Sequence, residues 1–337
     1  NYQTTGLGAE SLSTYNADAT AQRLVICKAG KMKWCLSVGD ISQAFLRARQ
    51  GEATSVEGQE ADKILVYLPA ALAELGLDVS VPYVVEAAMY GLRSSPADWE
   101  ACRDKGLTKM TWKVQGKNRR FVQNEADRSL WTIRDDDDVV HGWAAMYVDD
   151  MAIAAPEEEG QAALDAVHEV WALGSRSMLR HGEVGKEVRF CGLQVAGARD
   201  GEREGFYVHQ EKYVTEMLKK HNMQDCNSAV LPTEDRFTNE VEAEAAPDPK
   251  LVAQAQALVG GLQWVAGRTR ADLALATKMA ASAMTRAPTT AVKMAKKILR
   301  FLRGNPGGIF FGTDLQGPIV WQNDPDLSTI PVAPRES

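Results

Sequence analysis

The feature that most constrains this chain is the stretch AAMYVDDMAIAA at residues 144–155, in which Asp149 and Asp150 stand between two apolar runs. The runs predict two strands joined by a turn at the two aspartates, so both carboxylates are expected at the tip of a hairpin. A buried carboxylate destabilises a fold by several kcal/mol unless an opposite charge or hydrogen bonds compensate it. Two adjacent carboxylates between apolar strands therefore indicate a bound cation.

A third carboxylate extends this hypothesis. Leu36 and Val38 alternate with smaller residues as in a strand, and that strand is expected to end at Asp40. If the strands were neighbours, the three aspartates would form one acidic pocket. Two carboxylates about 4 Å apart repel by roughly 4 kcal/mol at an effective dielectric constant of about 20. Divalent cations relieve that repulsion, and hard oxygen ligands suit Mg²⁺ or Mn²⁺.

Such a pair of cations has a known chemical use, because two ions can activate an attacking hydroxyl and stabilise the leaving oxygen of a phosphoryl transfer. The alternative is an ordinary turn without a metal role, since Asp favours turns. The local sequence alone leaves both the metal site and the ordinary turn open. The acidic run at residues 135–138 has polar neighbours and lacks apolar flanks. It is therefore expected to be a solvated loop without a metal role.

The bulk composition excludes several classes of protein. The chain has 337 residues, of which 45% are hydrophobic and 25% charged, as is usual for a globular protein. We expect no membrane segment, because the sequence lacks an apolar run of roughly 18 residues, and its start lacks the pattern of a signal peptide. The five cysteines contain no CxxC pair, which favours a reducing interior over a disulfide framework. The five histidines form no zinc-binding pattern.

Charge is distributed unevenly along the chain. The net charge of −7 argues against a uniformly basic nucleic-acid binder, yet residues 268–303 hold nine Lys or Arg and one acid. Residues 233–250 hold six acids and are expected to be a linker. Three helices are expected after it, at residues 252–267, 271–285 and 290–302. Basic side chains at helical spacing on the last of them could neutralise the phosphates of a duplex, although a solvated helix face is equally open: Lys293, Lys296, Lys297, Arg300 and Arg303.

Taken together, these patterns predict an α+β fold, with a mixed sheet and helices followed by a helical basic module. Several blocks then occur in a fixed order along residues 14–312, and together they resemble the reverse transcriptase of copia-type LTR retrotransposons, a part of the Pol polyprotein. The blocks are DISQAF, MYGLRSSPADW, MYVDDMAIA, VRFCGLQV, HQEKYVTEMLKKHNM, LVGGLQWVAGRTRADLALA and KILRFLRG.

The resemblance implies a right-hand polymerase palm, with a mixed or antiparallel sheet and helices, followed by a helical thumb or connection. It implies that the chain is a nucleotidyltransferase, an RNA-directed DNA polymerase. Asp40, Asp149 and Asp150 match the catalytic aspartates, which bind two Mg²⁺ (or Mn²⁺) ions. Those ions activate the primer 3′-hydroxyl and hold the phosphates of the dNTP. The implied partners are an RNA or DNA template with its primer and dNTPs, with no membrane.

The resemblance also assigns roles around these aspartates. Phe45 matches the aromatic steric gate that selects deoxynucleotides, and a core phenylalanine is the alternative. Tyr90, Gly91 and Tyr147 match positions that line the nucleotide and template pocket. Cys191 and Gly192 fall at the primer grip, and the basic side chains of the last helix match nucleic-acid-binding positions. The family implies a location inside the cell, in a cytoplasmic retroelement particle, and leaves nuclear access and the oligomeric state open.

The sequence departs from the family in several places. Only 39 residues precede Asp40, and none resembles the basic fingers segment, so we expect the fingers to be largely missing. The family motifs FLG and RPD are FCG and RAD here. Two functions therefore remain open: a polymerase, or a catalytically inactive, decayed or domesticated remnant that at most binds nucleic acid. The expected domains are a palm with partial fingers (1–230), an acidic linker (231–250), a helical thumb or connection (251–310) and a truncated RNase H-like start (311–337), where Asp324 matches the first metal-binding aspartate.

Overall fold

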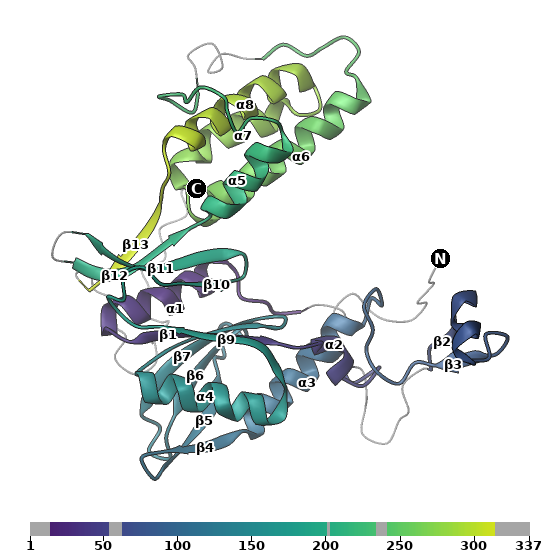
Figure 1. Cartoon of the computed structure of the whole chain (residues 1–337), viewed down its shortest axis with the longest axis vertical. Helices are drawn as coiled ribbons and strands as arrows, with labels where there is room; N and C mark the ends of the chain where they lie inside the picture. The colour runs from purple at the N-terminus through teal and green to yellow at the C-terminus, as the bar shows by residue number, and fades with distance from the viewer. Residues whose placement is uncertain (1–13, 54–62, 201–202, 234–240, 314–337) are drawn as a thin grey trace, which may run out of the picture.

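The computed structural model describes residues 14–53, 63–200, 203–233 and 241–313 (Figure 1). Its centre is a seven-stranded sheet in the order β4-β5-β6-β7-β8-β1-β9, and every neighbouring pair in it is antiparallel. The strands are β1 (Cys35–Ile41), β4 (Thr111–Val114), β5 (Lys117–Gln123), β6 (Leu130–Arg134), β7 (Val140–Tyr147), β8 (Asp150–Ala155) and β9 (Leu173–Leu179).

Helices cover both faces of this sheet, which explains why the segment after the aspartates is apolar without interruption. Along β8, Ala152 and Ala154 face a core shared with helix α1 (Ala19–Met32). Met151 and Ile153 face the opposite core, which contains side chains of α4 (Glu157–Val170) and of α3 (Ser95–Lys109). A strand that is buried on both faces has no polar face, so the usual alternation disappears.

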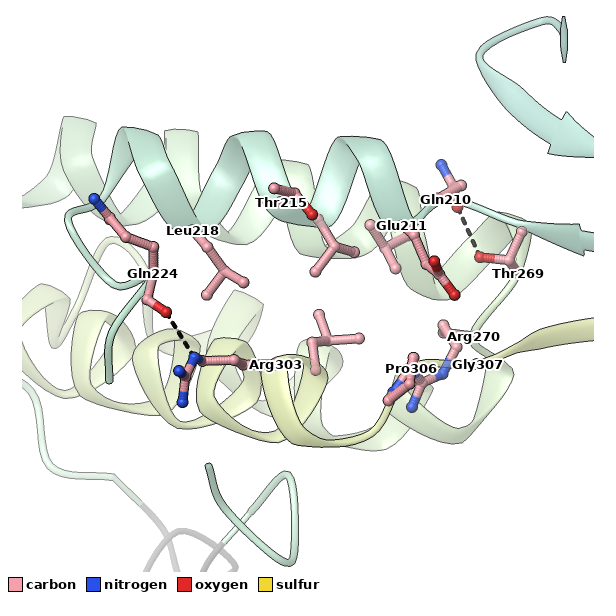
Figure 2. Close-up of a pocket in the computed structure, with 13 residues that line it drawn as sticks. Gln210, Glu211, Thr215, Leu218, Gln224, Thr269, Arg270, Arg303, Pro306 and Gly307 are labelled. Carbon is pink, nitrogen blue, oxygen red and sulfur yellow. Dashed lines mark hydrogen bonds between the residues drawn. The ribbon is translucent and has the colours of Figure 1, made fainter. Parts of the chain in front are cut away.

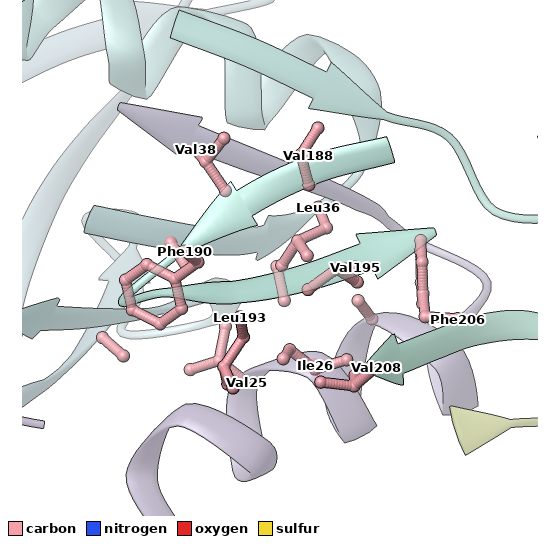
Figure 3. Packing of buried hydrophobic residues seen from close by; sticks show 14 of the residues in the cluster. Val25, Ile26, Leu36, Val38, Val188, Phe190, Leu193, Val195, Phe206 and Val208 are labelled. Carbon is pink, nitrogen blue, oxygen red and sulfur yellow. The ribbon is translucent and has the colours of Figure 1, made fainter. Parts of the chain in front are cut away.

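A second sheet lies on the other side of α1. Its four antiparallel strands have the order β10-β11-β12-β13. Figure 3 shows Val25 and Ile26 of α1 packed among side chains of both sheets, including Leu36 of β1 and Phe206 of β12. The strands are β10 (Glu187–Phe190), β11 (Leu193–Asp200), β12 (Arg203–His209) and β13 (Gly308–Gly312).

Between β12 and β13 the chain forms a helical module with its own apolar core (Figure 1). Three of its helices lie close to the positions expected from the sequence, because their apolar residues recur at helical spacing. The module consists of α5 (Glu211–Lys220), α6 (Pro249–Arg268), the short η4 (Ala271–Leu273), α7 (Ala274–Ala283) and α8 (Pro288–Gly304).

A small unit projects from the other end of the molecule (Figure 1). It pairs β2 (Leu65–Tyr67) with β3 (Pro82–Val84), and the short 3-10 helix η2 (Ala70–Leu75), none of whose residues is buried, lies between them in the sequence. The short helix α2 (Ala44–Arg47) lies between strand β1 of the large sheet and this unit in the sequence. Among the described residues, no helix is long and apolar enough to cross a bilayer.

The acidic stretch before α6 departs from the predicted linker. Within its described part, the Glu244 carboxylate accepts a hydrogen bond from the Thr289 N–H (2.9 Å), and Asp248 accepts one from the Lys250 N–H (2.9 Å). These acids therefore cap the first turns of α8 and α6, where the helix dipole favours negative charge. Residues 241–250 therefore belong to the helical module. Glu244 and Asp248 cap helix N-termini and do not form a solvated linker.

Two further expectations differ from the structure. Strand β13 pairs with β12 through residue 312, so Phe311 and Gly312 belong to the four-stranded sheet and not to a following domain. Residues 314–337, including Asp324, lie outside the described residues.

Asp135 is only 6% exposed and accepts hydrogen bonds from the N–H groups of Asp137 and Val139, so it is not a solvated loop acid. The hydrogen bond from His141 is the main cause that lowers the pKa of Asp135 to about 2.

Candidate active site

The strand register brings the three predicted aspartates to one place in the large sheet. Asp40, near the end of β1, lies directly opposite Asp150, the first residue of β8. The Ile41 N–H donates to the Asp149 carbonyl oxygen (2.9 Å), which ties the turn to the end of β1. The predicted turn is displaced by one residue, because Tyr147 pairs with Asp150 and the two turn residues are Val148 and Asp149.

The turn contains a strained residue that two distant side chains hold in place. Val148 has φ of 51°, in the left-handed region that β-branched residues rarely adopt. Its N–H donates to the Asn16 Oδ1 (3.0 Å), and its carbonyl accepts from the Trp99 Nε1 (2.7 Å). No sequence pattern indicates that Asn16 or Trp99 lies beside this turn. Only the tertiary fold reveals these contacts, since Asn16 is 132 positions away from Val148.

The carboxylates at this hairpin repel one another. The pKa of Asp150 is raised to about 6, first by burial and then by the charges of Asp149 and Asp40. Burial also raises the pKa of Asp149, and the charge of Asp40 adds to the rise. A hydrogen bond from the Cys191 N–H to the Asp150 Oδ2 (3.3 Å) opposes the rise at Asp150. The carboxylates are therefore close enough for the charge of one to raise the pKa of another, and a bound cation would offset this repulsion.

The predicted primer-grip residues lie beside these aspartates. Cys191 and Gly192 form the turn between β10 and β11 and have φ of 50° and 75°. Burial raises the pKa of the Cys191 thiol, and the neighbouring charge of Asp150 raises it further, so the thiol stays protonated. The backbone N–H of Cys191, and not its sulfur, is the group that contacts the aspartate.

The helical module also reaches this turn, through residues that the sequence analysis did not single out. A Cβ built on Gly192 would lie 3.7 Å from the ring of Trp264 on α6, so the indole faces the turn. The Arg268 guanidinium lies 4.4 Å from the centre of the same ring. An aromatic ring beneath a cation is a surface on which a nucleobase or a phosphate could rest. The tryptophan in LVGGLQWVAG was the available signal, because it interrupts an apolar helical pattern with a large amphipathic ring.

Of the aromatic residues predicted at the nucleotide pocket, Phe45 and Tyr90 contact each other, whereas Tyr147 lies in the hairpin beside Asp150. The rings of Phe45 and Tyr90 meet edge to face, with centroids 5.0 Å apart. Phe45 packs against the apolar core that includes Met151, whereas Tyr90 is 64% exposed. The contact is compatible with either interpretation of Phe45, so its role as a steric gate stays a prediction. Gly91 follows with φ of 94°, and Tyr147, an exposed residue, pairs with Asp150.

The basic stripe on α8 is divided into two parts. Lys293 and Lys296 are exposed, and Lys297 is half-buried. Arg300 donates from Nε to the Asn227 carbonyl (2.8 Å), and Arg303 donates to the carbonyls of Gln224 and Cys226. The two arginines therefore hold the loop after α5 against α8, and the outward-facing part of the predicted stripe is shorter than expected.

The residue type of the three aspartates fits Mg²⁺ or Mn²⁺, because carboxylate oxygens are the hard ligands that these ions prefer, and the strand register sets the backbones of Asp40 and Asp150 opposite each other. Among the described residues, the hydrogen bond that Asp150 accepts is at Oδ2, which leaves Oδ1 available. Across the described part of the chain, however, no group of three or more His, Cys, Asp or Glu side chains stands in a position to hold a metal ion. The site is therefore suitable in residue type and backbone position, whereas the side chains are not closed around a cation.

Two comparisons with known proteins bear on this site. No protein-family model matches the chain. The chain is 24% identical over 308 residues, 87% of its length, to the Retrovirus-related Pol polyprotein from transposon RE1 of Arabidopsis thaliana, and it spans 18% of that protein. Over most of its length, this chain is distantly similar to one part of a retrotransposon Pol polyprotein.

Proposed function

We propose that this chain is the polymerase part of a copia-type retrotransposon Pol polyprotein, an RNA-directed DNA polymerase that adds dNTPs to a primer 3′-hydroxyl. The observation that supports it best is the register of β1 and β8, which sets Asp40 opposite Asp150 with Asp149 in the adjoining turn. The distant similarity to a retrotransposon Pol polyprotein agrees with the same assignment.

In this proposal each residue near the turn has a defined task. Asp40, Asp149 and Asp150 would hold two Mg²⁺ or Mn²⁺ ions, which supply charge stabilisation for phosphoryl transfer when bound. Asn16 and Trp99 fix the strained Val148, and thereby the direction in which Asp149 and Asp150 point. The remaining groups bind substrate: Phe45 and Tyr90 the nucleotide, and Cys191, Gly192, Trp264 and Arg268 the primer end.

The alternative is an inactive remnant that at most binds nucleic acid, and one observation favours it. Among the described residues, no group of three or more His, Cys, Asp or Glu side chains stands in a position to hold a metal ion, as a two-ion polymerase site would require. The exposed lysines of α8 would be retained in either case, so nucleic-acid binding alone does not separate the two functions.

Primer extension separates them. The chain is incubated with an RNA template, a DNA primer, dNTPs and Mg²⁺ or Mn²⁺, and is compared with Asp40→Asn, Asp150→Asn and Asp137→Asn. Asp137 is an exposed turn aspartate away from the site and is the matched control. We expect extension by the wild type and by Asp137→Asn, and a loss of about a hundredfold or more in the other two variants. Absence of extension by the wild type, with duplex binding retained, would favour the remnant.

Metal binding gives a second readout that does not depend on turnover. Mn²⁺ titration followed by electron paramagnetic resonance should give saturable binding to the wild type and to Asp137→Asn. Binding should weaken in Asp40→Asn and Asp150→Asn, because each removes one negative charge and one anionic oxygen ligand. Equal binding by all four proteins would place any Mn²⁺ site elsewhere and would count against the polymerase.

A further inference from the structure

A cavity of about 320 Å³ lies in the helical module, apart from the aspartates (Figure 2). It is bounded by α5, by the C-terminal end of α6 and by the C-terminal end of α8, and it is partly open to solvent. Its volume is within the range of sites that bind small molecules. Of the residues predicted to serve the polymerase, Arg303 of the basic stripe lines it, whereas the aspartates and the residues around their turn do not.

The cavity wall is aliphatic in its middle. Val214 and Leu218 contribute from α5, Val265 from α6 and Leu302 from α8. Figure 2 shows the side chains of α5 and α8 directed toward the space between the two helices. This wall favours an apolar ligand body, because each apolar surface that leaves water on binding contributes to affinity.

Polar groups with unused donors lie toward the ends of the cavity. Gln210 is 2% exposed and its Oε1 pairs with the Thr269 hydroxyl (2.9 Å), whereas its Nε2 has no partner among the described residues. At the opposite end, Arg303 uses Nε and Nη1 for the carbonyls of Gln224 and Cys226. Its Nη2 has no partner in the described part of the chain, so part of the guanidinium charge remains available.

The two ends of the cavity differ in whether the arginine there is paired with an acid. Arg270 is neutralised by two hydrogen bonds to Asp272, from Nε (2.9 Å) and from Nη2 (2.7 Å), and lies near Glu211 in the lining. Arg303 pairs only with backbone carbonyls, and no acid of the described residues forms an ion pair with it. A ligand anion is therefore expected at Arg303, where Nη2, which has no partner among the described residues, can donate a charge-assisted hydrogen bond to a carboxylate oxygen.

We propose that this cavity binds a small organic carboxylate with an apolar body, with the carboxylate on Arg303 and the body against the aliphatic wall. The position of the cavity gives such a ligand a structural effect. Gln210 directly follows β12, and Pro306 and Gly307 directly precede β13, so the ligand would contact both connections between the helical module and the four-stranded sheet.

The test uses the full chain and three naphthalene probes that differ in charge: 1-naphthoate, neutral 1-naphthamide and cationic 1-naphthylmethylamine. Binding is followed by isothermal titration and by protein methyl chemical shifts. We expect 1-naphthoate to bind with a dissociation constant of about 1 mM, the amide about tenfold more weakly, and the amine not at all. Equal binding of the three probes, or no saturable binding of 1-naphthoate, would overturn the proposal.

Two variants locate the binding. Thr215→Phe fills the space from α5, whereas Glu216→Phe adds the same ring at the next exposed position outside the cavity. Binding should be lost in Thr215→Phe and kept in Glu216→Phe. Arg303→Gln should weaken 1-naphthoate about tenfold and leave the amide unchanged. Because Arg303 also holds a loop, Thr215→Phe is the decisive variant, and unchanged affinity in it would place the ligand elsewhere.

Discussion

At the scale of single residues, the aspartate pair destabilises the fold that presents it. Asp150 lies in an apolar hairpin beside Asp149 and opposite Asp40, and burial with these charges raises its pKa from the ordinary 3.8 to about 6. A group whose pKa is raised on folding binds its proton more tightly in the folded state. The free energy of unfolding therefore decreases as pH rises from about 4 to about 6, and the full penalty remains above that range.

The substitution Asp150→Asn should remove this penalty. At pH 7.5 we expect its free energy of unfolding to exceed that of the wild type by about 1 kcal/mol, a value reduced for the partial exposure of the carboxyl. Near pH 4 the two proteins should be equally stable, because the folded wild type is then protonated. Urea unfolding in metal-free buffer at both pH values measures the difference. A constant difference at both pH values would contradict the titration of Asp150.

At the scale of elements, short-range patterns predicted the strands and helices well, and the exceptions have a common cause. The hairpin of β7 and β8 and three helices of the module (α6, α7 and α8) follow from the apolar runs and the helical spacing of apolar residues. The strained turn residue Val148 and the capping role of Glu244 were not predicted, because their partners come from distant segments of the chain. Nothing local indicates that Glu244 meets a helix that begins more than forty residues later, at Pro288.

Glu244 provides a direct test of this capping. Glu244→Ala removes the carboxylate that accepts from the Thr289 N–H and leaves the first turn of α8 uncapped. We expect the free energy of unfolding to fall by about 1 kcal/mol, as for other lost helix caps. Glu242→Ala is the matched control, because that exposed acid lies in the same stretch. Equal urea midpoints for the two variants would mean that the acidic stretch is the solvated linker that the sequence suggested.

At the scale of the whole molecule, α1 joins the large sheet to the helical module. The Arg23 Nη2 donates to the carbonyls of Gly267 (2.6 Å) and Arg268 (2.8 Å) at the end of α6. The Arg268 Nη1 returns a hydrogen bond to Gln22 on α1 (2.9 Å). This reciprocal contact holds Trp264 and Arg268 near the aspartates, and sequence patterns give no indication of it because the partners are about 245 residues apart in the chain.

Double-mutant analysis tests this contact. Arg23→Gln and Arg268→Gln should each destabilise the protein, and the double variant should lose less than the sum of the two by about 1 kcal/mol. Hydrogen exchange of the amides at the end of α6 should accelerate in all three variants and stay slow in β8. Lys31→Gln, on the same helix α1, is the control. Strictly additive losses would show that the two arginines act independently.

The return of the chain at β13 has a consequence for the order in which the protein folds. His209 at the end of β12 pairs with Gly308 at the start of β13, and the whole helical module lies between these partners. Closing a loop of roughly 100 disordered residues for one strand pair is entropically costly, and such distant pairings form slowly. If the helices assemble first, their two ends already lie together and most of that cost disappears. The pairing of β13 with β12 should therefore form late in folding. Until then β12 should remain an exposed sheet edge, open to intermolecular pairing.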